Sequence, residues 1–118
     1  MAMDRLGCDV AVIYGAPGDQ VRTILRNSAR RGGITLWDSR YDLDHDGEMD
    51  KRVHHKYMLV NGVYAGDSSS WVVSTGSLNW AGGLHYTDEV TLNIASRTTY
   101  GQYMANWRFV TQHARRVR

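Results

Sequence analysis

The sequence is short of several residue types that mark whole classes of protein. It has one Cys and one Pro in 118 residues, so it contains no internal disulfide, and collagen and a disulfide scaffold are excluded. No apolar run approaches the roughly 20 residues that a membrane-spanning helix needs, and the start, MAMDRLGCDV, lacks the apolar core of a secretory signal. A content of 42% hydrophobic and 22% charged residues predicts a single globular domain over residues 1–118.

Lysine and glutamate are nearly missing, although other charged residues are common. Of the 14 Lys and Arg residues, only Lys51 and Lys56 are lysines. Of the 12 Asp and Glu residues, only Glu48 and Glu89 are glutamates. The net charge of +2 is too small to diagnose a nucleic-acid binder. A Lys or a Glu inside a chemical motif is therefore informative in this chain.

The first third of the chain alternates between strand and helix patterns. Apolar, β-branched runs predict strands over residues 8–15 and 34–40. Between them, helical spacing of apolar residues begins near Pro17 and stops at Gly32 and Gly33. These elements predict a βαβ unit with a parallel, right-handed crossover.

The remainder of the chain predicts three more strands and a final helix. Residues 54–64 and 70–80 have the pattern of two strands joined in a hairpin, and residues 89–95 have that of a further strand. An amphipathic stripe over residues 98–118 predicts a helix with cations at its carboxyl end. These cations are Arg115, Arg116 and Arg118. The whole order predicts an α/β fold, with a mixed sheet sandwiched between helices.

Two short motifs in the predicted hairpin carry the chemistry. His54 and Lys56 are two residues apart on a predicted strand, so their side chains are expected on one face. At the end of the adjoining strand, Gly76, Ser77 and Asn79 supply loop N–H groups, a hydroxyl and a carboxamide. Such donors converge on an anion, so the sequence predicts an anion site next to an imidazole and an ammonium group.

These motifs resemble the signature of the phospholipase D superfamily, most closely that of its secreted actinobacterial members. The signature is His-x-Lys, an Asp five residues after the Lys, Gly-Ser-x-Asn and often a later acidic residue, here Glu89. The resemblance covers about residues 8–118. The chain departs from the pattern at Asn61, which occupies the Asp position, and in a longer spacer, which an inserted turn over residues 66–70 explains.

The resemblance implies a phosphodiesterase that works in two steps. One His attacks phosphorus to form a phosphohistidine, a second His protonates the leaving oxygen, and water then reverses the steps. It implies the catalytic residues His54, Lys56 and Asn79 and the substrate-binding residues Gly76, Ser77 and Glu89. Phospholipid is the favoured substrate, and lipid degradation outside the cell is the implied setting.

The chain holds one His-x-Lys motif, whereas this chemistry needs two imidazoles facing the phosphate. The superfamily meets this need with two homologous halves in one polypeptide or with a symmetric homodimer. We therefore expect this chain to be a carboxyl-terminal half of a longer protein, weakly active by itself. Two alternatives stay open: a nuclease that acts as a homodimer on nucleic acid, and a non-catalytic half domain that binds only anions or partners.

An acidic stretch before the His-x-Lys motif has the spacing of a calcium loop. The sequence DLDHDGEMD places acids at positions 1, 3, 5 and 9, a Gly at position 6 and a Glu carbonyl at position 7. The candidate ligands are Asp42, Asp44, Asp46, Glu48 and Asp50. Val53 at position 12 excludes an EF-hand. Structural Ca²⁺, which would not take part in the reaction, and a solvated acidic turn are both open interpretations.

Overall fold

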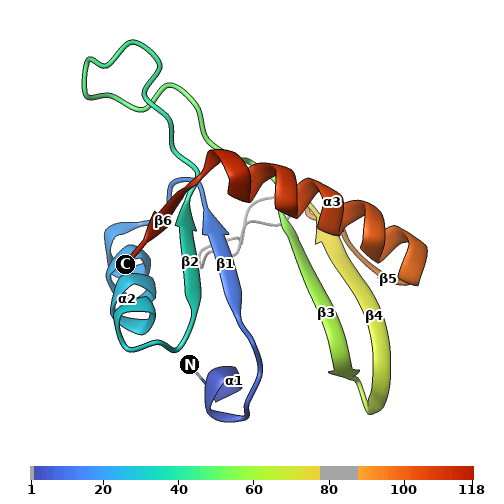
Figure 1. Ribbon diagram of the computed structural model, residues 1–118. Helices are drawn as coiled ribbons and strands as arrows, with labels where there is room; N and C mark the ends of the chain where they lie inside the picture. The colour runs from blue at the N-terminus through green and yellow to red at the C-terminus, as the bar shows by residue number, and fades with distance from the viewer. Residues whose placement is uncertain (1, 78–87) are drawn as a thin grey trace. The chain divides into compact units, whose positions relative to one another are not determined.

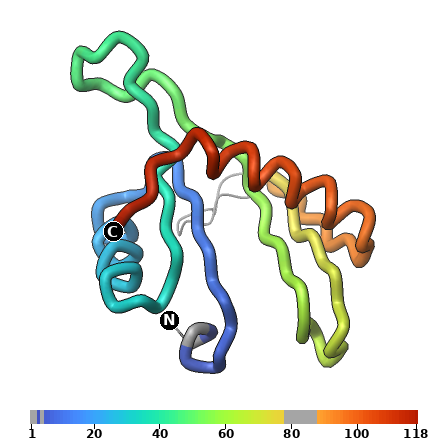
Figure 2. Tube along the Cα trace, viewed as in Figure 1, coloured from blue at the N-terminus to red at the C-terminus, as the bar shows by residue number. Residues whose placement is uncertain are grey.

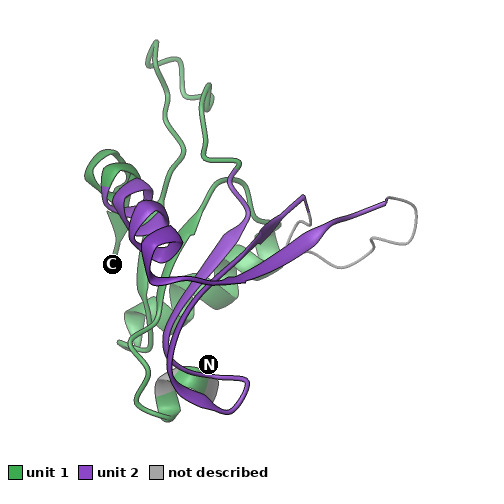
Figure 3. Cartoon of the chain, turned by 90° about the vertical axis from the view of Figure 1, so that its right-hand side faces the viewer, with its two compact units in different colours: residues 1–54, 109–118 green, residues 55–108 purple. Residues whose placement is uncertain are grey.

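The computed structural model describes residues 2–77 and 88–118 and divides the chain into two compact units. Unit 1 comprises Met1–His54 with Phe109–Arg118, and unit 2 comprises His55–Arg108 (Figure 3). Both contain strands and helical residues, so the prediction of a mixed α/β fold is confirmed. The described strands form two sheets of three strands each.

Unit 1 is built on the predicted βαβ segment. A short helix, α1 (Ala2–Arg5), is followed by β1 (Ala11–Tyr14), α2 (Asp19–Arg30) and β2 (Thr35–Asp38). The strands β1 and β2 pair in parallel, as expected from the sequence, and they run side by side in Figure 1. Gly32 follows α2 at a φ of +73°, a conformation that glycine adopts without steric cost, so the helix ends there.

The end of the chain forms a strand, which corrects the sequence prediction. The helix α3 (Arg97–His113) ends before the final arginines, which fall in or just after β6 (Arg115–Val117). This strand pairs antiparallel with β2 and opposes Val117 to Leu36, giving the order β1-β2-β6. A longer helix would leave Val117 away from the apolar core of unit 1, and pairing with β2 brings the side chain against it.

The core of unit 1 is a small apolar cluster between its sheet and α2. Its buried members are Tyr14, Leu25, Ile34 and Leu36. Leu36 is completely inaccessible to solvent, and Leu25 comes from the apolar face of α2. Burial of this cluster stabilises the parallel strand pair, and it thereby fixes the carboxyl ends of β1 and β2, where the chain continues toward the polar loop.

Unit 2 contains an antiparallel sheet of β3 (Tyr57–Tyr64), β4 (Asp67–Gly76) and β5 (Thr91–Ala95), with β4 in the centre. The two-residue turn between β3 and β4 has positive φ at both positions, 49° at Ala65 and 88° at Gly66. Positive φ at both central residues is typical of the type I′ turn, whose twist matches that of a hairpin. The predicted hairpin is confirmed.

Aromatic contacts attach α3 to this sheet within unit 2. The rings of Tyr57 and Tyr103 meet edge to face with centroids 5.0 Å apart, and those of Trp71 and Tyr100 do the same. The Tyr57 hydroxyl also donates a hydrogen bond to Asn106 Oδ1 at 3.0 Å, and burial raises the pKa of Tyr57. No helix among the described residues is long and apolar enough to cross a membrane, as the sequence predicted.

Candidate functional site

In unit 2, Lys56 extends the hydrogen bonding between β3 and β4 by one residue before β3 begins. The Lys56 carbonyl accepts hydrogen bonds from the Gly76 N–H at 3.3 Å and from the Thr75 hydroxyl at 3.2 Å. Lys56 of the His-x-Lys motif is therefore held by its backbone directly beside the Gly-Ser pair. Unit 2 thus brings Lys56 beside Gly76, which lies 20 residues later in the sequence.

Ser77 and Glu89, both predicted to bind substrate, are in direct contact. The Ser77 hydroxyl donates to a Glu89 carboxylate oxygen and accepts a bond from the Val90 N–H at 3.1 Å. The Ser77 N–H donates to the Val90 carbonyl at 3.0 Å. These bonds close the exposed end of β4 against the residues that lead into β5 and fix the hydroxyl beside a carboxylate.

Gly76 is required at this edge because the backbones approach too closely for a side chain. A Cβ at this position would lie 1.9 Å from the Val90 carbonyl oxygen and 2.9 Å from its carbon. Real non-bonded carbon and oxygen atoms do not approach so closely. The glycine of the predicted Gly-Ser-x-Asn motif is thus explained by the pairing of β4 with the segment before β5.

His54 does not lie on a strand, which corrects the sequence argument that put it on one face with Lys56. β3 begins only at Tyr57, and residues 52–56 have no regular structure. The ladder stops there because its partner β4 ends at Gly76. His54 is exposed and is the last residue of unit 1, whereas Lys56 belongs to unit 2. Asn79 lies outside the described residues.

The residue before His54 is anchored within unit 1 at the carboxyl ends of β1 and β2. The Val53 N–H donates to the Ser39 hydroxyl at 3.2 Å, and that hydroxyl donates to the Tyr14 carbonyl at 2.8 Å. A Cβ at Gly15 would lie 2.5 Å from the Val53 carbonyl oxygen, so glycine permits the close approach. Ligands of parallel α/β sheets bind at this end of the strands. His54 follows directly from this anchor.

A buried ionic network supports the same strand ends, and the sequence analysis missed it. Asp38 is 1% exposed and receives hydrogen bonds from Arg40 Nε at 2.9 Å and Nη2 at 2.6 Å. The Tyr14 hydroxyl and Arg115 Nη2 each donate to it at 3.2 Å. Burial alone would raise the pKa of Asp38, but the hydrogen bonds and charge of Arg40 lower it to about 2. The sequence did contain a signal for this network, because Asp38 ends an apolar strand and Arg40 follows two residues later.

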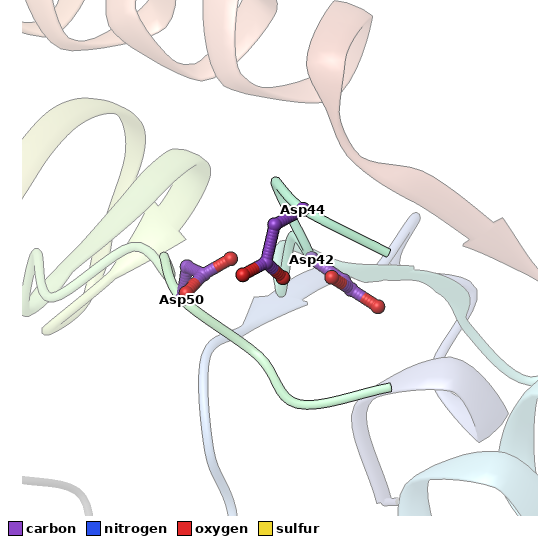
Figure 4. Close-up of side chains that lie close together, drawn as sticks. All are labelled: Asp42, Asp44 and Asp50. Carbon is purple, nitrogen blue, oxygen red and sulfur yellow. The ribbon is translucent and has the colours of Figure 1, made fainter. Parts of the chain in front are cut away.

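The acidic loop of unit 1 brings three of the five predicted calcium ligands together. One carboxylate oxygen each from Asp42, Asp44 and Asp50 lies within 4.8 Å of the others (Figure 4). The Asp46 carboxylate instead accepts a hydrogen bond from the Glu48 N–H at 2.8 Å. Glu48 was predicted to contribute its main-chain carbonyl, and this stays a prediction. The structure thus brings together three of the four predicted aspartates.

The two arms of the acidic loop are paired, and one carboxylate oxygen of Asp42 has no hydrogen-bond partner. Figure 2 shows the chain leaving β2, passing through the loop and returning, and the two arms are joined by a bridge between Tyr41 and Lys51. The Asp42 Oδ2 atom accepts a bond from the Gly47 N–H at 2.9 Å, but its Oδ1 is buried and has no hydrogen-bond partner. A buried carboxylate oxygen without a donor fits a cation, and carboxylates are the ligands that Ca²⁺ prefers.

In comparisons with known proteins, no family model matches the chain, and neither a curated protein nor a solved structure matches it. The resemblance to the phospholipase D superfamily therefore stays a prediction.

Proposed function

We propose that this protein is a phosphodiesterase of the phospholipase D type, with phospholipid as the favoured substrate and a phosphohistidine intermediate. The fold we propose is a phospholipase D-like half domain with its sheet between helices, completed by a second His-x-Lys half in the same polypeptide or in a homodimer. We place its action outside the cell, as in the secreted proteins that its motifs resemble.

The observation that carries this proposal is the convergence of motif residues at the end of β4. Lys56, Gly76, Ser77 and Glu89 come from three separate segments, and backbone and side-chain hydrogen bonds join them. The pairing of β3 with β4 brings the Lys56 backbone beside Gly76, and hydrogen bonds hold Ser77 against Glu89 and Val90. The ammonium group of a Lys and the hydroxyl of a Ser are donors of the kind that stabilises the charge on a phosphoryl group in flight.

In the proposed mechanism, His54 attacks phosphorus or protonates the leaving oxygen, and the imidazole of the second half performs the complementary step. The P–O bond to the leaving group breaks as the N–P bond forms, and water later cleaves the N–P bond. Lys56 and Asn79 stabilise the phosphoryl oxygens, and Ser77 joins them when its O–H turns from Glu89 to the phosphoryl group. Glu89 orients the Ser77 hydroxyl through their hydrogen bond, and the anchored Val53 supports the position of His54.

Replacing His54 with Ala tests this function. We expect hydrolysis of bis(p-nitrophenyl) phosphate by the full-length protein to fall by about 10³-fold or more, because both proposed roles need the imidazole. The adjacent exposed residue supplies a matched control, since His55→Ala removes an imidazole that has no role in the mechanism. Unchanged turnover in His54→Ala would leave only the alternative of a domain that binds anions or partners.

The substrate class is tested with two phosphodiesters of different chemistry, a phospholipid and a nucleic acid. We expect release of choline from phosphatidylcholine vesicles and no cleavage of plasmid DNA. Cleavage of the plasmid alone, by a dimer whose DNA affinity falls steeply with salt, would show that the protein is a nuclease and does not act on phospholipid.

We propose further that the acidic loop binds a structural Ca²⁺ through Asp42, Asp44 and Asp50. The three converging carboxylates and the unsatisfied Asp42 oxygen support this assignment. The ion would screen the repulsion among the acids and fasten the two arms of the loop, the second of which leads to His54. It would take no part in the reaction.

A further inference from the structure

Two adjoining cavities lie in unit 1 at the amino ends of β1 and β2, the opposite ends from the Val53 anchor. The larger has a volume of about 560 Å³ and is lined in part by Val10 and Ile34, which precede the two strands. The smaller has a volume of about 220 Å³. The larger volume lies within the range of roughly 300–1,000 Å³ that is typical of small-molecule sites. Nothing in the proposed phosphodiesterase mechanism uses this region.

Arginines line both cavities and make up most of the lining of the smaller one. Arg30 at the end of α2 and Arg116 and Arg118 in β6 and just after it line both, and Arg26 lines the smaller one. Among the described residues that line the cavities, Asp9 has the only acidic side chain. Arg115 also lines the smaller cavity and shares the Asp38 carboxylate with Arg40. The side chains that line the two spaces therefore carry an excess of positive charge.

Arg26 also carries a donor that has no acceptor. Its Nε atom is buried and makes no hydrogen bond. A buried donor left without a partner is unfavourable, and more so when the group is charged. An oxygen-rich anion in the adjoining cavity would supply the missing acceptor. The cavity, the excess positive charge and this donor are separate observations, and all three point to an oxyanion.

We propose that these arginines form a binding site for the phosphate group of a phosphomonoester. Guanidinium groups bind phosphate oxygens in pairs through their planar forks. A phosphomonoester carries nearly two negative charges near neutral pH, so it balances several arginines better than a carboxylate does. None of the residues that line the site belongs to the two motifs, and the proposal does not depend on the proposed catalytic function.

Isothermal titration calorimetry of the full chain with inorganic phosphate tests the site. We expect one phosphate to bind with a dissociation constant below about 1 mM, equivalent to roughly 4 kcal/mol. The variants Arg30→Gln and Arg116→Gln should each weaken binding at least tenfold. The matched control is Arg31→Gln, because Arg31 is the next residue after Arg30 but lines neither cavity.

The outcomes distinguish a specific phosphate site from nonspecific attraction by the positive charge of the protein. Equal weakening by Arg31→Gln and Arg30→Gln overturns the proposal, because net charge alone would then explain binding. The absence of any phosphate binding also overturns it and leaves the arginines as stabilisers of the carboxyl end of α2. Since Arg30 lies at that helix end, Arg118→Gln supplies a second test that does not affect the helix.

The unsatisfied donor and the source of the phosphate are tested separately. Arg26→Lys keeps the charge but removes the Nε donor, so we expect phosphate affinity to fall about fivefold, and unchanged affinity contradicts the role of Nε. Phosphatidylcholine vesicles with and without phosphatidic acid then identify the source. Binding to phosphatidic acid that free phosphate displaces indicates a lipid headgroup, and binding of free phosphate alone indicates a soluble ester. Vesicle binding that free phosphate does not displace contradicts the proposal that these arginines form the phosphate site.

Discussion

Unit 1 contains two groups of carboxylates that differ in how their negative charge is compensated. Asp38 is buried and is neutralised by Arg40 and Arg115, which belong to the protein itself. The acids of the 42–50 loop converge without a cation from the described residues, and Asp42 Oδ1 has no partner. The first group carries its compensating charge within the fold, whereas for the second we propose a cation from solution. Changes in calcium and pH should therefore separate the two groups.

The largest expected effect concerns the loop. Ca²⁺ at a free concentration of 100 times its dissociation constant should stabilise the protein by about 2.7 kcal/mol, which raises the melting temperature by about 10 °C at this chain length. Adding EDTA should reverse the shift, as measured by circular dichroism at pH 7. Asp44→Asn should remove most of the response to calcium.

Asp67→Asn is the matched control for the calcium response. Asp67 is exposed, lies in the β3–β4 hairpin region and accepts a bond from the Ser69 N–H, so it is an acid of similar exposure outside the loop. It should keep the full calcium shift. A melting temperature that neither calcium nor EDTA changes would show that the loop is a solvated acidic turn.

The next effect concerns Asp38 and acid. Its pKa in the folded protein is about 2, below the ordinary value of 3.8, so folding favours its ionised form. The resulting stabilisation, about 2 kcal/mol, is present above pH 4 and should be lost as the pH falls from about 4 to 2. Urea unfolding at pH 5, 3 and 2 measures this loss.

Asp38→Asn isolates this contribution from that of the other acids. The amide keeps the shape of the side chain but cannot ionise, so the variant should be less stable at pH 5 and should lose less stability on acidification. A parallel decline of the two proteins from pH 5 to pH 2 would mean that other carboxylates control the acid response.

The smallest effect tests whether the fixed strand ends position His54. Ser39→Ala removes the hydroxyl between Val53 and Tyr14, at a cost of about 1 kcal/mol in stability. We expect kcat for diester hydrolysis to fall about tenfold with KM unchanged, because the misplaced imidazole affects the transition state more than substrate binding.

Ser39→Thr keeps the hydroxyl and should restore most of this turnover. A rise in KM with constant kcat, or no recovery in the Thr variant, would assign Ser39 a purely structural role. This result is independent of the calcium response, so the two measurements separate the loop from the strand ends.

Local patterns in the sequence predicted most of the secondary structure. The apolar spacing before Gly32 identified α2, and the β-branched runs identified the parallel pair of β1 and β2. These predictions succeed because periodicity and turn residues act over a few positions. The final helix was predicted too long, because nothing local shows that Val117 packs against the core beside Leu36.

The candidate site was predictable only in part. The motif composition singled out Lys56, Ser77 and Glu89, and the structure joins their segments. The argument for His54 used strand alternation and was wrong about the local structure, since β3 begins after it. The roles of Ser39 and Asp38 were not predicted, because each depends on contacts with residues that are distant in the sequence.

The sequence by itself determined the class of elements, the hairpin and the types of chemical group available, because these depend on propensity and spacing within short segments. Only the tertiary structure decided that Asp38 meets Arg115 across 77 positions, that Glu89 bonds to Ser77, and that five arginines line one pair of cavities. Such pairings depend on how strands are ordered in a sheet, and the sequence contains no local signal of that order.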